Sequence, residues 1–147
     1  MRQITILPAS PQDITFMAKA ACANNYSAPW GKKEFSDELS QPAARLYTAF
    51  YGGDFAGFIS LRFCCGEGEI NNFAVMPQFM RLGIGSALLA YAVRQAGEEN
   101  ISKLVLEVNS NNSAAVNLYK KFSFKTVNIR KKFYNNKEDA FLMVKDL

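Results

Sequence analysis

The sequence contains no histidine, and this absence restricts the chemistry that the chain can perform. Ser-His-Asp and Cys-His catalysis are excluded, and so are zinc sites with imidazole ligands. The three cysteines, Cys22, Cys64 and Cys65, cannot complete a zinc site built from thiolates alone. We therefore predict no metal site. A general acid or base must therefore be an Asp, Glu, Tyr, Lys or Cys side chain.

Long apolar runs are also missing. No stretch reaches the ~18 apolar residues of a membrane span, and the N-terminus lacks the apolar core of a signal peptide. An odd number of cysteines, two of them adjacent, does not indicate a disulfide framework and favours a reducing compartment. We expect a cytoplasmic protein without membrane attachment. We also expect one domain over residues 1–147, as a monomer or a weak dimer.

The formal net charge is +4, which favours anionic partners. The excess of cations lies late in the chain, in Lys120, Lys121, Lys125, Arg130, Lys131, Lys132 and Lys137. We interpret this group as a solvated basic face, so that direct binding of nucleic acid is not expected. The alternative is a basic RNA-binding module, in which these cations would act together with Phe122, Phe124, Phe133 and Tyr134.

Residues 72–89 carry the most informative pattern in the chain. An apolar run at 73–75 is ended by a proline, as at the end of a strand, and from residue 84 onward apolar residues recur at helical spacing. The start of such a helix exposes backbone N–H groups, and Gly83 and Gly85 leave room beside them. The pattern predicts a cradle for a phosphate or pyrophosphate, with a strand–helix turn that holds no ligand as the alternative.

Two common phosphate-binding motifs do not fit this stretch. No Gly-Lys-Ser/Thr follows, so it is not a P-loop. Leu88 stands where the dinucleotide-binding fingerprint needs its third glycine, and no early βαβ unit precedes it.

The pattern along the rest of the chain predicts a mixed α/β sheet with flanking helices. Expected strands are 4–7, 46–51, 55–64, 69–75, 102–109, 124–133 and 140–145, with a turn at 135–137. Expected helices are about 10–23, 32–40, 84–96 and 112–121. Consecutive antiparallel strands followed by a strand–helix–strand unit make such a sheet mixed.

The stretch 80–85 resembles motif A of the GNAT acetyltransferases, which is Gln/Arg-x-x-Gly-x-Gly/Ala after a strand that ends in Val-x-Pro. The resemblance continues in order through Ala28-Pro29-Trp30 with Phe35, Leu106-Glu107-Val108, Asn112 with Ala115 and Leu118-Tyr119, Arg130 to Tyr134, and Glu138-Asp139-Ala140 with Met143. It points to the RimI-type branch, which acetylates protein N-terminal α-amines, including that of a ribosomal protein beginning with alanine. Two positions depart from the family pattern: Met80 replaces the first Gln/Arg of motif A, and Ser123 replaces a glycine.

This resemblance implies a GNAT fold, with a mostly antiparallel sheet and one parallel strand pair, and acetyl-CoA as co-substrate. Backbone groups of Phe73, Ala74 and Val75 would align with the pantetheine arm. The amides of Arg81, Leu82, Gly83, Ile84, Gly85 and Ser86 would bind the pyrophosphate. Asn112 corresponds to a family residue near the pantetheine, while its place before a helix equally predicts a plain N-cap. Met80 removes one polar side chain from the pyrophosphate site, which predicts weaker CoA binding.

Glu107 is the candidate general base. It is a carboxylate within the apolar strand 103–108, and burying a charge costs several kcal/mol unless the charge is paired or neutralised. Exposure to solvent, or a pair with a nearby lysine, is the alternative that the pattern alone leaves open. The resemblance places Glu107 at the base position of the RimI-type branch, with Glu69 on the preceding strand as the reserve candidate.

The resemblance implies roles for several further side chains. Tyr119 is the candidate acid that protonates the CoA thiolate, although a helical tyrosine is commonly a core aromatic residue. Asn72 and Tyr134, with Glu69, are candidates for contacts with the incoming N-terminus. We expect Cys64 and Cys65 to be small buried residues rather than acyl carriers, so that transfer would be direct.

The kind of amine decides how strong a base is needed. An α-amine with an ordinary pKa near 8 is roughly one-tenth neutral at pH 7, whereas a lysine amine is neutral only about four times in ten thousand. A single glutamate therefore suits an α-amine, which favours a protein N-terminus as substrate. The alternatives are a GNAT enzyme for another amine (an internal lysine, a polyamine or another small molecule) and a GNAT protein that binds CoA without turnover.

Overall fold

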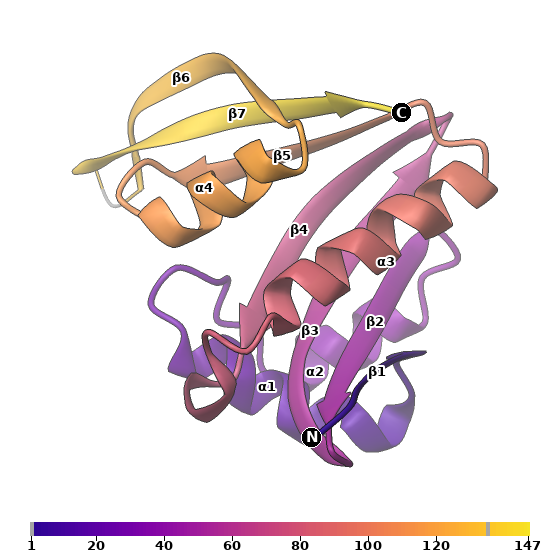
Figure 1. Ribbon diagram of the computed structural model, residues 1–147. Helices are drawn as coiled ribbons and strands as arrows, with labels where there is room; N and C mark the ends of the chain where they lie inside the picture. The colour runs from indigo at the N-terminus through magenta and orange to yellow at the C-terminus, as the bar shows by residue number, and fades with distance from the viewer. Residues whose placement is uncertain (1, 135) are drawn as a thin grey trace.

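The computed structural model describes residues 2–134 and 136–147, so that Asn135 of the expected turn lies outside the described residues. Within them, one seven-stranded sheet has the strand order β1-β2-β3-β4-β5-β7-β6 (Figure 1). The strands are β1 (Ile4–Pro8), β2 (Ala44–Tyr51), β3 (Asp54–Cys64), β4 (Glu67–Val75), β5 (Lys103–Asn109), β6 (Lys125–Tyr134) and β7 (Glu138–Asp146). The helices are α1 (Ile14–Ala23), α2 (Lys32–Leu39), α3 (Ile84–Glu98) and α4 (Ser113–Lys121), with 3₁₀ turns η1 (Pro11–Asp13) and η2 (Pro77–Phe79). The predicted fold class is confirmed: β4 and β5 are parallel, and the other neighbouring strands are antiparallel.

Local signals in the sequence explain where the first helical segment begins. The backbone N–H of Ser10 donates a hydrogen bond of 2.9 Å to Oδ2 of Asp13, as in a capping box. Pro11 takes the first helical position, where its missing N–H costs nothing. The segment starts as η1 and continues as α1, so the expected helix is present but changes type at Asp13.

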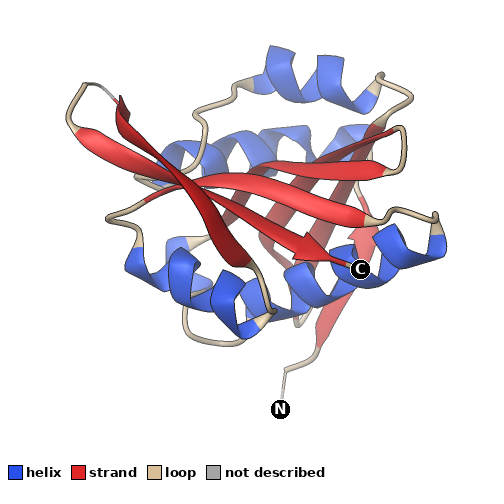
Figure 2. Ribbon diagram, turned by 90° about the horizontal axis from the view of Figure 1, so that it is seen from above, coloured by secondary structure: helices blue, strands red, loops and turns tan. Residues whose placement is uncertain are grey.

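Helices cover both faces of the sheet (Figure 2). On one face, α3 and α4 pack over a large apolar cluster that includes Leu88, Leu104 and Leu106. On the other face, α1 and α2 pack over a smaller cluster that includes Met17 and Phe35. Residues of β3 are buried on both faces of the sheet, which explains why this strand reads as a nearly continuous apolar run.

The parallel pair of strands forms a fork. Ladder pairing between β4 and β5 runs from Glu67↔Lys103 to Ile70↔Leu106, and beyond this point the two strands diverge (Figure 1). On its other side β4 contains a bulge, because Ser60 pairs with Asn72 but Leu61 pairs with Ile70. Asn71 is therefore the extra residue of the bulge, and it lies where the fork opens.

The basic residues late in the chain are exposed, as a solvated face requires. Of the four aromatic residues that an RNA platform would use, Phe133 is 47% exposed, whereas Phe124 is buried and Phe122 and Tyr134 are partly buried. The four rings therefore do not form the exposed set that stacking on bases needs. None of the described helices is long and apolar enough to cross a membrane.

The expectation that Cys64 and Cys65 are buried is wrong, because both side chains are exposed. Cys64 ends β3, and Cys65 sits in the following turn with a left-handed φ of 56°. Both lie at the closed end of the fork, because Cys64 pairs with Glu67 at the start of β4.

Candidate active site

A groove of about 770 Å³ opens where β4 and β5 separate. Its walls come from β4, the start of α3, the end of β5, the helix α4 and the segment 23–27. Because the ladder between the two strands ends at Ile70↔Leu106, the edge of β4 from residue 71 onward faces this groove rather than a partner strand. An unpaired strand edge offers backbone donors and acceptors to an extended ligand.

The groove ends against the first turn of α3. Gly83 is the N-cap, with a left-handed φ of 85°, and Arg81 before it also has a positive φ of 64°. The first intrahelical bond joins Ala87 N to Gly83 O at 3.0 Å, so the N–H groups of residues 84–86 have no acceptor within the helix. Of the predicted cradle, Arg81, Gly83, Ile84, Gly85 and Ser86 line the groove. Leu82 does not line it and is 43% exposed.

The absence of a side chain at Gly85 keeps the groove open between α3 and β4. A Cβ added there would lie 3.5 Å from Leu118 Cδ2 and 3.7 Å from Phe73 Cζ, and both of these side chains line the groove. A methyl group would make ordinary contacts, but a longer side chain would fill the space beside β4. The groove thus combines a narrow channel along a strand edge with free helix N–H groups at one end. This arrangement suits a ligand made of an extended amide chain and a pyrophosphate.

Glu107 reaches the groove from the end of β5. Its Oε1 lies 3.5 Å from Nη2 of Arg130 on β6, and its Oε2 is buried with no hydrogen-bond partner among residues 2–134 and 136–147. The alternative of a lysine pair is therefore replaced by a pair with an arginine from a distant strand. Burial and the negative charge of Glu107 raise the pKa of Tyr134, which lines the same groove.

Tyr119 is a core residue and also lines the groove. Its side chain is 5% exposed, and its ring centroid lies 6.3 Å from that of Phe73 and 5.5 Å from that of Phe124. Burial raises the pKa of Tyr119 well above its ordinary value, and the neighbouring Tyr134 adds to the effect. The phenol is therefore protonated at neutral pH, as an acid must be before it acts.

The two asparagines that the sequence indicated both line the groove but have structural partners. Asn112 is the N-cap of α4, and its Oδ1 accepts a hydrogen bond of 3.3 Å from Ala115 N. Asn72 is buried, donates from Nδ2 to the carbonyl of Ala28 at 3.0 Å, and accepts from Phe73 N at 3.0 Å. Asn72 thus ties β4 to the segment that follows α1.

Glu69 and Asn71 differ from what the sequence suggested. Glu69 is exposed and pairs with Val105 in the ladder before the fork opens, and it is not among the residues that line the groove. Asn71 lines the groove, although sequence reasoning did not single it out. The signal that could have identified Asn71 is the pair Asn71-Asn72. Two consecutive polar residues interrupt the alternation of polar and apolar residues along β4, as at a bulge.

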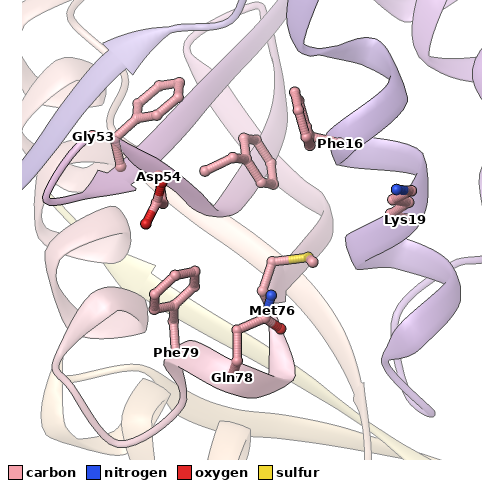
Figure 3. A pocket seen from close by; sticks show the side chains of 9 residues that line it. Phe16, Lys19, Gly53, Asp54, Met76, Gln78 and Phe79 are labelled. Carbon is pink, nitrogen blue, oxygen red and sulfur yellow. The ribbon is translucent and has the colours of Figure 1, made fainter.

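A second, smaller cavity of about 450 Å³ lies near the β2–β3 hairpin. Phe16 of α1, Asp54 of the hairpin, and Met76 and Phe79 of the segment leading to α3 surround it (Figure 3). Phe79 lines both cavities, but none of the predicted catalytic residues lies in the smaller one. Among the residues that the structure describes, no cluster of three or more Cys, Asp or Glu is placed to hold a metal ion.

The chain is similar to known proteins in sequence and in fold. The model of the acetyltransferase (GNAT) family matches residues 15–124. An N-alpha-acetyltransferase from Sulfurisphaera tokodaii is 35% identical over 126 residues, which cover 77% of this chain and 75% of the relative. A ribosomal protein bS18-alanine N-acetyltransferase from Escherichia coli K12 is 29% identical over 121 residues, covering 80% and 81% of the two chains. The crystal structure of the ribosomal-protein-S18-alanine N-acetyltransferase from Escherichia coli matches with a TM-score of 0.86 at 26% identity, covering 98% of this chain and 94% of that one.

Proposed function

Because this chain belongs to the acetyltransferase (GNAT) family and is an acetyl-CoA-dependent N-acetyltransferase, we propose that its acceptor is the N-terminal α-amine of a protein. The observation that carries this proposal is that Glu107 and Tyr119, a carboxylate and a buried phenol, line the same groove as the free edge of β4 and the first turn of α3. A small residue such as alanine is the proposed first residue of the acceptor, and a ribosomal protein is the proposed partner. The name of the Escherichia coli relative supports both points.

The residues of the groove fit the donor. Phe73, Ala74 and Val75 line the groove on the edge of β4, where their backbone groups would hydrogen-bond an amide-containing arm, and the amides at the start of α3 would bind a pyrophosphate. Arg81 adds a positive charge at the same place. When bound, acetyl-CoA supplies a thioester, whose carbonyl carbon is the acetyl donor.

Two side chains would handle the protons of the transfer. As the amine nitrogen forms its bond to the acetyl carbon, Oε2 of Glu107 accepts a proton from that nitrogen, directly or through one water molecule. As the carbon–sulfur bond breaks, the hydroxyl of Tyr119 donates its proton to the departing sulfur. The raised pKa of Tyr119 keeps this proton in place until then. The proton balance closes when solvent returns a proton to Tyr119 and removes one from Glu107.

A direct assay tests the substrate class. CoA release from acetyl-CoA is measured with a peptide that begins Ala-Arg, beside the same peptide blocked at its N-terminus but carrying a free lysine. We expect turnover of the free α-amine alone. Turnover of the lysine peptide alone, or of both peptides equally, would show a lysine or broad-amine enzyme instead. Binding of acetyl-CoA without turnover of either peptide would also contradict the proposed acceptor.

A further inference from the structure

Asn71 and Glu107 occupy equivalent places on the two strands of the fork. The last ladder pair is Ile70↔Leu106, and the next residue on each strand is Asn71 on β4 and Glu107 on β5. Ile70 and Leu106 both point into the cluster under α3, so their successors point to the opposite face of the sheet. Both successors line the groove. The mouth of the fork is thus flanked by one amide and one carboxylate.

Each of these side chains presents a buried oxygen without a partner. In the described parts of the chain, Asn71 Oδ1 and Glu107 Oε2 are both buried and accept no hydrogen bond. A buried acceptor left unpaired costs free energy, so such groups in a native structure call for a donor. Two such acceptors flanking one groove suit a ligand group that carries at least two N–H bonds.

The orientation of the Asn71 amide is fixed from behind by α2. Its Nδ2 lies 3.5 Å from Oε2 of Glu38, which is buried and forms two hydrogen bonds with Arg62, at 2.8 Å and 2.7 Å. A carboxylate can only accept hydrogen bonds, so the nitrogen of the amide must face Glu38 and the oxygen must face away from it. Arg62 keeps Glu38 ionised, because its hydrogen bonds lower the pKa of Glu38. Neither Glu38 nor Arg62 lines the groove, so this pair would act on a ligand only through Asn71.

We propose that Asn71 binds the acceptor amine: its Oδ1 accepts one N–H of the amine while Oε2 of Glu107 takes the proton that the amine loses. This inference rests on the proposed function. An arriving ammonium group has N–H donors and no acceptor. Once this group has lost one proton to solvent, the neutral amine donates one N–H to Asn71 and the other to Glu107, so its lone pair is directed away from both oxygens. Glu107 then accepts its proton as the bond to the acetyl carbon forms. Asn71 would thus orient the nucleophile, and Glu38 is a positioning residue behind it.

The first test substitutes the amide by an apolar side chain of similar shape. Asn71→Leu should raise the peptide KM about tenfold, which corresponds to about 1.4 kcal/mol, while the Kd of acetyl-CoA measured by calorimetry stays unchanged. Asn117→Leu is the matched control, because Asn117 is exposed on α4 and does not line the groove. Equal peptide KM values for Asn71→Leu and the wild type would overturn the proposal. If Asn71→Leu does not fold, Asn71→Ala replaces it in the same comparison.

The second test removes an N–H from the substrate instead. An N-methylated peptide has one N–H fewer on its terminal nitrogen, so it cannot satisfy both oxygens. N-methylation should lower kcat/KM about fivefold more in the wild type than in Asn71→Leu, because the variant has already lost that hydrogen bond. An equal penalty in both proteins would show that Asn71 does not contact the amine. If the wild type turns over only the lysine peptide, the proposed substrate class is wrong. The same comparison made on the lysine amine then still decides the role of Asn71.

Discussion

Arg130 pairs with one oxygen of Glu107, with Nη2 lying 3.5 Å from Oε1, while Oε2 is buried and has no hydrogen-bond partner among the described residues. The two oxygens of one carboxylate therefore have different surroundings. The ion pair restrains rotation of the carboxylate and leaves Oε2 as the oxygen available for the proposed proton transfer. This division explains how a charged residue can lie within an apolar strand and still be available for chemistry.

Glu107→Gln should lower kcat by about 10²- to 10⁴-fold, because glutamine keeps the shape of the side chain but cannot accept a proton. The Kd of acetyl-CoA should not change, since the proposed contacts lie on β4 and α3. CoA release measured from about pH 6 to 9, with calorimetry for binding, checks both statements. Glu69→Gln is the matched control and should stay within about twofold of the wild type, because Glu69 is outside the groove. Loss of activity in the control alone would transfer the role of base to Glu69.

Tyr119→Phe should lower kcat by about 10- to 100-fold with little effect on stability, because phenylalanine keeps the ring packed against Phe73 and Phe124. The raised pKa of Tyr119 means that its ionisation should not appear in the pH–rate profile below about pH 10. Tyr91→Phe removes a hydroxyl from α3 outside the groove and serves as the control. Wild-type turnover by Tyr119→Phe would leave Tyr119 with a packing role only.

Substitutions at Gly85 should distinguish a small side chain, which the groove tolerates, from a larger one, which blocks it. Gly85→Ala should keep the Kd of acetyl-CoA within about threefold, because its Cβ would meet Leu118 at an ordinary 3.5 Å, and it should raise the melting temperature through better helix propensity. Gly85→Leu should weaken binding at least about 100-fold, because its branches would enter the space beside β4. Calorimetry and thermal unfolding of the two variants provide the comparison. Equal affinities would mean that acetyl-CoA lies elsewhere.

Met80→Gln should tighten acetyl-CoA binding about three- to tenfold, because it restores the polar residue with which motif A begins. Met80 lines the groove and is 47% exposed, so a glutamine has room to turn toward the start of α3. Leu82→Gln introduces the same side chain at a neighbouring position that does not line the groove, and it should leave the Kd unchanged. A similar gain in both variants would point to a general change in surface polarity instead.

Glu38→Gln should destabilise the protein by about 1–2 kcal/mol at neutral pH, because glutamine carries no charge and can accept only one of the two hydrogen bonds that Arg62 donates to Glu38. Those hydrogen bonds lower the pKa of Glu38 in the folded state. The stabilisation is therefore complete above the ordinary glutamate pKa of 4.5 and is lost as the pH falls through the lowered value. The stabilities of wild type and variant, measured by urea unfolding, should thus converge as the pH falls from 4.5 through the lowered pKa of Glu38. Asp37→Asn, one residue earlier on the same helix, should stay close to the wild-type curve, because the ion pair that Asp37 forms with Lys33 is exposed to solvent.

The order of strands and helices could be predicted because turn residues and apolar periodicity are local signals. The cradle at the start of α3 was visible for the same reason, since Gly83 and Gly85 lie within one short stretch. The partner of Glu107 could not be found in this way. Arg130 lies on β6 and reaches Glu107 across β7, so this pair depends on the order of strands in the sheet. The bulge at Asn71 left a trace in the sequence, but which groups face its side chain depends on how α2 packs against the sheet.

The fork also has a mechanical consequence. The ladder between β4 and β5 has four residue pairs, compared with seven between β5 and β7, so the sheet is joined at a short seam. We expect the part of the sheet that ends in β4 and the part that begins with β5 to move relative to each other. Beyond the short ladder, the two parts are connected by the packing of α3 and α4. Acetyl-CoA bound between the diverging ends of β4 and β5 would contact both parts and restrict this motion. Amide hydrogen exchange should therefore slow in β5 and β7 when acetyl-CoA binds, including at amides far from the ligand.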